Sequence, residues 1–190
     1  MNTEKRSALL LIDIQQSFEH KPYWQTDELP AFQRNVLALI AAAKARNVPV
    51  LRILHVDPDG EFSLASGWVK PMAFLPEDCT AEFHKSAHNS FSTTGLQRWL
   101  IEHDINHLVI TGIRTEQCCE TTARVASDLG YAVDYVTEAT LTFAMTHPVS
   151  GRRYSTAELK AHTELVLHNR FARIATVADC LREWQVEQAA

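Results

Sequence analysis

The stretch Ala8-Leu9-Leu10-Leu11-Ile12-Asp13 decides the fold. Its apolar residues follow one another without alternation, and a carboxylate ends the run. A strand with one solvated face alternates apolar and polar residues, whereas a strand of a parallel sheet is covered on both faces and is apolar throughout. Residues 8–12 therefore predict a buried strand of a parallel sheet, with Asp13 at its carboxyl end.

Strands and helices alternate along the rest of the chain. One helix is predicted between Pro30 and Asn47, and residues 155–158 and 176–179 resemble capping boxes that open two more. The other predicted strands lie at Val50 to Val56, Glu82 to His84, His107 to Thr111, Tyr131 to Val136 and Ala172 to Ala175. This alternation predicts an α/β fold with a largely parallel sheet. Because no linker or repeat interrupts it, we expect a single domain over residues 1–190.

Composition narrows the class of protein. The 190 residues are 46% hydrophobic and 22% charged, with a net charge of −5 and no basic block, which argues against a nucleic-acid partner. The longest apolar run, residues 36–43, is far shorter than the roughly 20 residues that span a bilayer. The 4 cysteines form no CxxC pair, which indicates free thiols. We expect a cytoplasmic protein with a small-molecule ligand and no membrane partner.

Three chemically active residues stand at or near the ends of predicted strands. Asp13 ends the first strand, Lys85 follows the short third one, and Cys118 follows the turn at 112–115 near a helix predicted over 117–129. Ligands of such sheets bind beyond the carboxyl ends of the strands. A base, a cation and a nucleophile there suit covalent attack on a carbonyl. Singly, an aspartate in this position is as often a helix or loop cap, whereas a lone lysine is usually a solvated surface residue and a lone cysteine is usually a small buried side chain.

Three motifs resemble those of the isochorismatase-like cysteine hydrolases, over most of the chain. They are Leu10-Leu-Ile-Asp13-Ile-Gln15-Gln-Ser-Phe18, Lys85 with Asn89-Ser90-Phe91, and Thr111-Gly112-Ile-Arg-Thr115-Glu-Gln-Cys118-Cys-Glu-Thr-Thr122-Ala123. The third is the most specific, because the family pattern Thr-x-x-Cys, with Thr-Ala four and five residues later, fits only Cys118 as the nucleophile. Cys119 then stands where the family usually has an aliphatic residue.

The resemblance implies a three-layer α/β/α Rossmann-like fold with a mainly parallel six-stranded sheet. It also implies a catalytic triad in which Asp13 takes the thiol proton, Lys85 holds the carboxylate and thiolate in register, and Cys118 attacks an amide or ureido carbonyl. Water then releases the acyl-enzyme. The backbone N–H groups of Arg114 and Cys118 would form the oxyanion hole, and the peptide joining Ile113 to Arg114 would be cis.

Two departures from the family narrow the reaction. The metal motif Asp-x-His of the nicotinamidase branch would fall near Asp57-Pro-Asp59, which lacks the histidine, so we expect neither metal nor cofactor and do not favour nicotinamide as substrate. Enzymes of this family that hydrolyse the vinyl ether of isochorismate typically do not retain the cysteine. The presence of Cys118 therefore favours cleavage of a C–N bond.

Six residues are candidates for the substrate pocket. The guanidinium of Arg114 would bind a substrate carboxylate, unless it forms a salt bridge within the protein. For the other five, packing in the core or in a loop is the competing interpretation. The irregular stretch from Asp57 to Pro76 is expected to roof the pocket. The six candidates are Phe18, Trp24, Trp68, His88, Asn89 and Arg114.

The sequence leaves three functions open. The first is the amidase chemistry above, which trapping of an acyl group on Cys118 would demonstrate. The second is isochorismatase-type hydrolysis of a non-amide bond in the same pocket without a covalent step, which turnover by Cys118→Ala would favour. The third is a metabolite-binding protein without catalysis, since one α/β fold hosts many functions.

We predict that Cys118, and not its neighbour Cys119, faces the pocket. Consecutive helical residues point about 100° apart, so one of the two thiols packs inward. Near neutral pH, iodoacetamide should label Cys118 before Cys119, Cys79 and Cys180, although the charge of Asp13 opposes this activation. Peptide mapping after brief labelling measures the order. If Cys119 labels first, the assignment of the nucleophile is wrong.

We also predict a homo-oligomer. The family resemblance suggests one, and Trp68, Phe74 and Trp184 stand in segments with no obvious inner face. Sedimentation at micromolar concentration should show a species larger than the monomer. A monomer under these conditions would contradict the prediction.

Overall fold

Strand β1 (Ser7–Ile12) lies inside a six-stranded parallel sheet, as its apolar run predicts. The computed structural model describes residues 5–186 and gives the strand order β3-β2-β1-β4-β5-β8. The other strands are β2 (Val50–His55), β3 (Ala81–Lys85), β4 (His107–Ile113), β5 (Ala132–Leu141) and β8 (Arg173–Ile174). The chain builds outward from β1 to β3 and then returns to place β4 on the other side of β1. The strand order therefore reverses between β1 and β4, where such sheets bind ligands.

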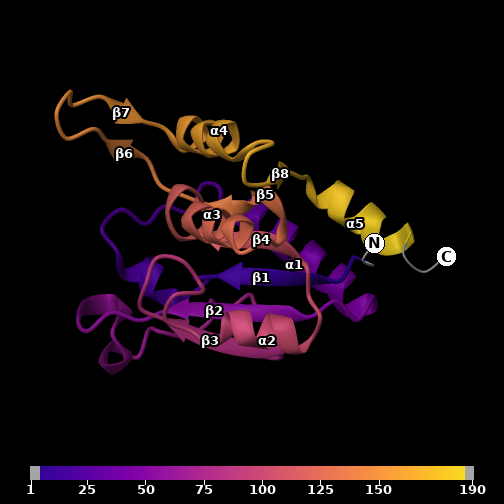
Figure 1. Ribbon diagram of the computed structural model, residues 1–190. Helices are drawn as coiled ribbons and strands as arrows, with labels where there is room; N and C mark the ends of the chain where they lie inside the picture. The colour runs from indigo at the N-terminus through magenta and orange to yellow at the C-terminus, as the bar shows by residue number, and fades with distance from the viewer. Residues whose placement is uncertain (1–4, 187–190) are drawn as a thin grey trace.

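Helices cover both faces of the sheet (Figure 1). Leu9 and Leu11 of β1 belong to the apolar layer that includes side chains of α1 and α5. Leu10 and its neighbours Ala8 and Ile12 belong to the opposite layer, with side chains of α2, α3 and α4. The helices are α1 (Leu29–Ala45), α2 (Leu96–Glu102), α3 (Glu120–Asp128), α4 (Thr156–Leu167) and α5 (Val177–Val186). The predicted three-layer α/β/α fold is confirmed.

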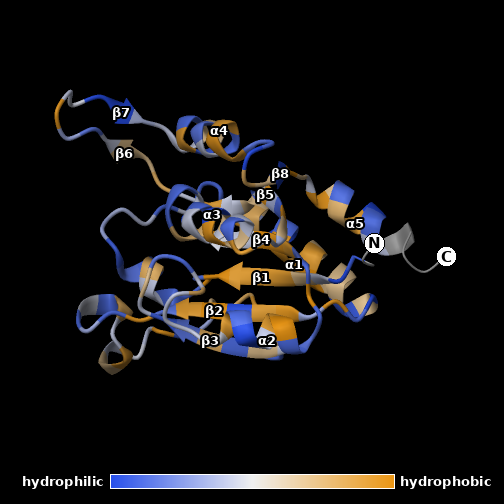
Figure 2. Ribbon diagram, in the orientation of Figure 1, coloured by the Kyte–Doolittle hydropathy of each residue, from blue (hydrophilic) through white to orange (hydrophobic). Residues whose placement is uncertain are grey.

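The distribution of hydrophobic residues over the strands and helices agrees with these layers. Figure 2 shows β1 and β2 as hydrophobic along most of their length, whereas α2, α4 and α5 carry both hydrophobic and hydrophilic residues. A strand buried on both faces has no polar side, whereas an outer helix has one. Within residues 5–186, no helix has the length and apolar character that a membrane crossing requires.

Strand β5 extends to Leu141, beyond its predicted end at Val136, and two other segments also differ from the sequence prediction. The helix predicted from Gln117 begins at Glu120, because Thr115–Cys119 forms one π-helical turn (η4) before α3. The other is an antiparallel hairpin of β6 (Met145–Thr146) and β7 (Arg153–Tyr154), which Figure 1 shows projecting beyond the sheet before α4. Strands of two residues carry no periodic signal, so the hairpin had no counterpart in the prediction.

Both predicted capping boxes are present, and the loop after β2 is irregular apart from short helical turns. Ser155 caps α4 and exchanges hydrogen bonds with Glu158. The backbone N–H of Thr176 donates to Asp179 Oδ2, and the N–H of Asp179 donates to Thr176 Oγ1. The short turns in the segments after β1 and β2 are η1 (Gln16–His20), η2 (Gly60–Phe62) and η3 (Leu64–Ser66).

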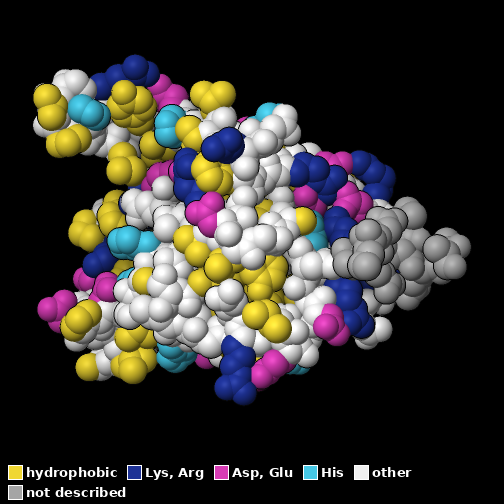
Figure 3. All heavy atoms as spheres, viewed as in Figure 1, with side chains coloured by type: hydrophobic (Ala, Val, Ile, Leu, Met, Phe, Trp, Pro, Cys, Tyr) yellow, Lys and Arg dark blue, Asp and Glu magenta, His cyan; other side chains and the backbone are white. Residues whose placement is uncertain are grey.

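The aromatic residues that suggested an oligomer mostly make contacts within the chain. Trp184 is buried in the layer of α1 and α5, Phe74 packs against that layer, and Trp68 stacks on His20 with ring centroids 3.9 Å apart. The exposed apolar residues include Met145, Val149 and Leu165, on or near the β6–β7 hairpin and α4. Figure 3 shows hydrophobic side chains on this projecting part. The homo-oligomer stays a prediction, and the hairpin is a surface on which to test it.

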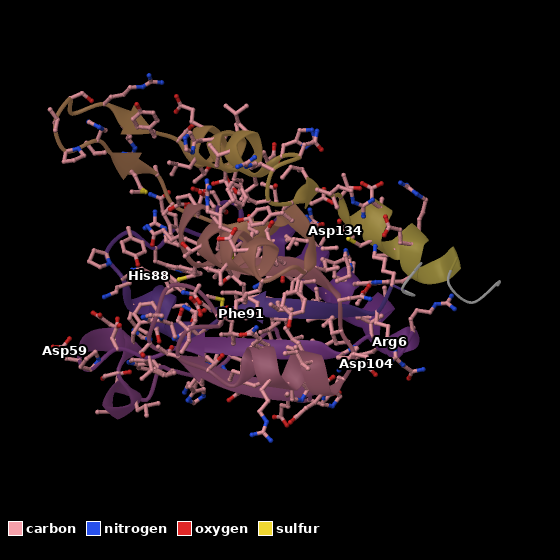
Figure 4. The ribbon with its side chains drawn as sticks, in the orientation of Figure 1. Arg6, Asp59, His88, Phe91, Asp104 and Asp134 are labelled. Atoms are coloured by element: carbon pink, nitrogen blue, oxygen red, sulfur yellow. The ribbon has the colours of Figure 1, made fainter. Side chains whose placement is uncertain are left out.

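A buried polar ladder joins four strands near the amino edge of the sheet. Ser7 Oγ lies 2.9 Å from His107 Nδ1, and His107 Nε2 lies 3.1 Å from Asp134 Oδ2. Arg173 Nε donates to Asp134 Oδ1 at 2.7 Å. Burial acts to raise the pKa of Asp134, but hydrogen bonds from His107 and Arg173 hold that pKa well below its usual range. Figure 4 shows Asp134 far from His88, which lies toward the opposite edge.

The close approach of β4 to β1 requires a glycine. Gly112 pairs in register with Ile12, and its φ of 135° is in the region that favours glycine. A Cβ atom on Gly112 would lie 2.0 Å from the carbonyl oxygen of Ile12. This contact stands directly before Asp13, so it fixes how the end of β1 meets the end of β4.

We predict that Gly112→Ala destabilises the fold. The added methyl group must displace the backbone of β1, and the alanine must adopt a φ that is unfavourable for a residue with a side chain. Together these effects should lower the free energy of unfolding by about 3 kcal/mol or more. Urea denaturation measures this. Gly95→Ala is the matched control, because Gly95 has no positive φ and open space around its missing Cβ. Equal midpoints for the two variants would contradict the prediction.

Candidate active site

Asp13 leaves β1 with an unusual backbone conformation. Its φ is 53°, a left-handed value that costs energy for a residue with a side chain, and its N–H donates to the carbonyl of Ile53 at 2.8 Å. The residue is fully buried. The turn directs the carboxylate into the space beyond the carboxyl ends of β1 and β2, and within residues 5–186 neither carboxylate oxygen accepts the backbone N–H that a helix or loop cap would bind.

Lys85, the last residue of β3, extends its ammonium group into the same space. Its Nζ lies 2.9 Å from Asp13 Oδ2 and 3.4 Å from Cys118 Sγ. The side chain has 0% exposure, so the interpretation as a solvated surface lysine is wrong. Register explains how it arrives there, because Lys85 pairs with His55 at the end of β2.

Cys118 belongs to the π-helical turn η4, which the core holds in place. The hydroxyl of Tyr135 donates to the carbonyl of Thr115 at 2.6 Å, and Thr115 Oγ1 lies 2.7 Å from Thr140 Oγ1. Cys118 is 9% exposed, whereas Cys119 is completely buried. The turn therefore presents one thiol to the Lys85 ammonium and packs the other inward.

The three side chains form an electrostatically coupled set. Burial raises the pKa of Asp13, and the Lys85 charge only partly opposes this. Burial acts to lower the pKa of Lys85, but Asp13 and Cys118 raise it above its ordinary value. Burial and the Asp13 carboxylate raise the pKa of the Cys118 thiol, and Lys85 lowers it only in part. These shifts favour a neutral Cys118 thiol beside a charged Lys85 ammonium at rest.

These pKa shifts bear on the labelling of the cysteines. Burial raises the pKa values of Cys79 and Cys119 as well. Cys79 is only partly buried, so access favours it over Cys118 and opposes the predicted order for that pair. Between Cys118 and Cys119, exposure favours Cys118. The complete order of labelling stays a prediction.

Comparison with known proteins identifies the family. The family model of the isochorismatase domain matches residues 7–179. The chain belongs to the isochorismatase family. It is accordingly a hydrolase of that family, and the match spans the sheet, the turn that carries Cys118 and the loops between them.

Relatives and solved structures agree with this assignment. The chain is similar to YrdC, an isochorismatase family protein of Bacillus subtilis, with 26% identity over 95% of this chain and 97% of the relative. It is 29% identical to nicotinamidase 3 of Arabidopsis thaliana, over 73% of this chain and 75% of the relative. An isochorismatase-family structure from Burkholderia xenovorans superposes with a TM-score of 0.88 at 26% identity, covering 97% of this chain and 89% of that one.

One group of possible metal ligands lies within the site itself. Single ligand atoms of Asp13, His55 and Cys118 lie within 4.8 Å of one another. Lys85 Nζ is 2.9 Å from the Asp13 oxygen, 2.9 Å from His55 Nδ1 and 3.4 Å from the Cys118 sulfur. The ammonium group is thus the cation that these three atoms surround. Asp57, where the family's metal motif would begin, instead contacts His55 Nε2 through Oδ1 at 2.8 Å.

Arg114 is paired within the protein. Its guanidinium lies 3.2 Å from Glu116 Oε1 and donates to the carbonyl of Phe143 at 3.0 Å. It also lies over the rings of Tyr23 and Phe143. Because Glu116 already neutralises the charge, the internal salt bridge is the interpretation that the geometry favours over capture of a substrate carboxylate. The peptide bond from Ile113 to Arg114 is cis, as the family resemblance implied.

The other predicted pocket residues have different environments. Phe18 packs edge-on against Phe62, and Trp24 packs on Phe143. His88 is exposed, with its ring 6.3 Å from that of His55.

Trp68 and Asn89 make contacts that stabilise the loops in which they lie. Trp68 stacks on His20, and its carbonyl accepts a hydrogen bond from Ser17 Oγ. Asn89 Oδ1 accepts the N–H groups of Phe91 and Ser92. Packing within a loop, rather than contact with a substrate, is therefore the interpretation that describes both residues.

The sequence prediction missed four residues of this region. They are His55, Tyr23, Glu116 and Phe143. His55 lies one residue before the end of a predicted strand, and that position was the available signal, whereas Tyr23 and Phe143 lie in loops without a periodic pattern.

Proposed function

We propose that this protein is a cysteine hydrolase that cleaves a C–N bond of a small amide, ureido or carbamoyl compound through a thioester on Cys118. The observation that carries the proposal is the buried Lys85 ammonium, which contacts both Asp13 and Cys118. This arrangement provides a nucleophile, a base for its proton and a cation for the charge that develops. It needs no cofactor.

In the first half-reaction, Cys118 Sγ attacks the substrate carbonyl while Asp13 accepts the thiol proton. The raised pKa of Asp13 suits it to take up that proton and return it. Lys85 stabilises the sulfur as it gains negative charge. The backbone N–H groups of Arg114 and Cys118 are the proposed donors to the oxyanion. As the tetrahedral adduct collapses, the C–N bond breaks and Asp13 gives its proton to the departing nitrogen.

In the second half-reaction, water attacks the thioester and Asp13 takes one of its protons. The C–S bond breaks, the acid is released, and the proton returns from Asp13 to the Cys118 sulfur. Each turnover thus consumes one amide and one water, and it leaves the three side chains as they began. The raised thiol pKa is compatible with this cycle, because the proton moves during attack and a preformed thiolate is not required.

The relatives support a C–N bond as the target. One of them is named nicotinamidase 3, an amidase name, and the cysteine that such chemistry requires is present here as Cys118. Isochorismatase-type hydrolysis of a non-amide bond is the alternative reaction. We place the activity in the cytoplasm, where a reducing environment keeps Cys79, Cys118, Cys119 and Cys180 as the free thiols of the structure.

We predict that Cys118→Ala abolishes ammonia release from every substrate found in a panel of small amides, ureido acids and carbamoyl compounds. Loss of a covalent nucleophile should lower kcat by at least about a thousandfold. Cys119→Ala is the matched control, and it should change mainly stability, by about 1–2 kcal/mol. Mass spectrometry of the acid-quenched wild-type enzyme should show an acyl group on the peptide that contains Cys118.

The alternatives give different results in the same experiment. Full turnover by Cys118→Ala would show that the reaction has no covalent step on this residue, as in isochorismatase-type hydrolysis. Binding without turnover across the panel would favour a metabolite-binding protein. Either result would overturn the proposed mechanism.

A further inference from the structure

The hydrogen bonds of the Lys85 ammonium involve a residue outside the proposed mechanism. An ammonium has three N–H groups, and four acceptors lie around this one. Asp13 Oδ2 and His55 Nδ1 are nearest, both at 2.9 Å, followed by the carbonyl of Ala87 at 3.2 Å and Cys118 Sγ at 3.4 Å. His55 therefore provides one of the two shortest contacts of the central cation.

This contact fixes the protonation of His55. Because an ammonium can only donate, His55 Nδ1 must carry a free lone pair, and the neutral ring then has its proton on Nε2. That nitrogen lies 2.8 Å from Asp57 Oδ1, so its N–H donates a hydrogen bond to the Asp57 carboxylate. An imidazolium would point an N–H at the ammonium. The order Asp57, His55, Lys85 is thus a directed chain of donors and acceptors.

The backbone of His55 is held as firmly as its ring. Gln15 Oε1 accepts the N–H of His55 at 2.7 Å, and Gln15 Nε2 donates to its carbonyl at 3.0 Å. Gln15 itself is fully buried. The His55 ring packs against Phe62, with centroids 5.8 Å apart. A side chain supported in this way can define the position of the group that it contacts.

We propose that His55 is a positioning residue for Lys85. It accepts one N–H of the ammonium through Nδ1, and Asp57 selects the tautomer that makes this possible. The two remaining N–H groups are then shared among Asp13, Cys118 and the Ala87 carbonyl. The inference rests on the proposed function for its catalytic meaning, but the hydrogen bond itself exists without any substrate.

Loss of this acceptor should affect the charge of Lys85. A buried ammonium keeps its proton only while acceptors replace its lost water. The charged and titratable groups that face it are Asp13 beyond β1, His55 and Asp57 at the end of β2, and Cys118 in η4, with His88 stacked behind His55. Without His55, the ammonium should lose its proton at lower pH and stabilise the sulfur less well.

The first test reads the tautomer directly. Long-range ¹H–¹⁵N spectra of the wild-type protein at neutral pH should show His55 as a neutral ring protonated at Nε2. An Nδ1–H tautomer or an imidazolium at neutral pH would overturn the inference, because neither can accept from Lys85. This measurement requires neither a substrate nor a variant.

The second test uses iodoacetamide as a probe of the Cys118 thiol. His55→Leu keeps the size of the side chain but removes the acceptor, and it should slow alkylation of Cys118 at pH 9 by about tenfold, the low end of the effect of one hydrogen bond to a charged group. His55→Asn keeps an acceptor close to the position of Nδ1 and should recover most of the rate. Equal alkylation rates in wild type and His55→Leu would overturn the inference.

The kinetic test uses the best substrate of the amide and ureido panel. His55→Leu should lower kcat by about tenfold to a hundredfold with little change in KM, and it should move the alkaline limb of the kcat/KM profile to lower pH. His84→Leu is the matched control, because His84 precedes Lys85 but is exposed and contacts Glu82. An unmoved alkaline limb would contradict the positioning role.

The tautomer, alkylation and kinetic measurements distinguish failure of the role of His55 from failure of the proposed function. If no compound of the panel is hydrolysed, the proposed function fails, while the tautomer and the alkylation rates still decide the role of His55. If His55→Leu does not fold, as judged by circular dichroism, His55→Asn and the wild-type tautomer carry the decision. Loss of the alkylation rate in His55→Asn equal to that in His55→Leu would show that the acceptor is not what matters.

Discussion

The ammonium of Lys85 is buried, and protein atoms take the place of the water that would otherwise hydrate it. This requirement constrains the whole carboxyl edge of the sheet. An isolated buried charge is unstable by several kcal/mol, so acceptors must surround it with good geometry. They come from the ends of three strands and from one helical turn: Asp13, His55, the Ala87 carbonyl and Cys118. Each of these elements must end at its proper residue, or the ammonium loses a partner.

The two edges of the sheet use buried charge in different ways. At the amino edge, Ser7, His107, Asp134 and Arg173 form a ladder in which Asp134 is fully compensated, and its pKa lies well below the usual range. At the carboxyl edge, burial raises the pKa of Asp13 although a cation is in contact with it. A carboxylate in the first state stabilises structure, whereas one in the second can exchange a proton during a reaction.

Much of the fold was predictable because its signals are local. The apolar run at 8–12 reports a strand covered on both faces, and the capping boxes at 155–158 and 176–179 report helix starts. The family motifs pointed to Asp13, Lys85 and Cys118, which the fold brings into contact. The role of His55 was not predictable, because it depends on the pairing of His55 with Lys85 between β2 and β3. The register of two strands cannot be deduced from the sequence of one local segment. The salt bridge of Arg114 with Glu116 likewise depends on the shape of a single turn.

The proposed reacting groups and the aromatic side chains packed near them come from different parts of the chain. Asp13, Lys85 and Cys118 are tied to strand ends and to a turn anchored on the core, whereas Phe18, Tyr23, Trp24 and Phe62 belong to segments that follow β1 and β2. Mutations in those segments can change the packing of these aromatic side chains while the core keeps Asp13, Lys85 and Cys118 in place. Under the proposed mechanism, substrate preference can therefore change in evolution while the catalytic residues keep their positions.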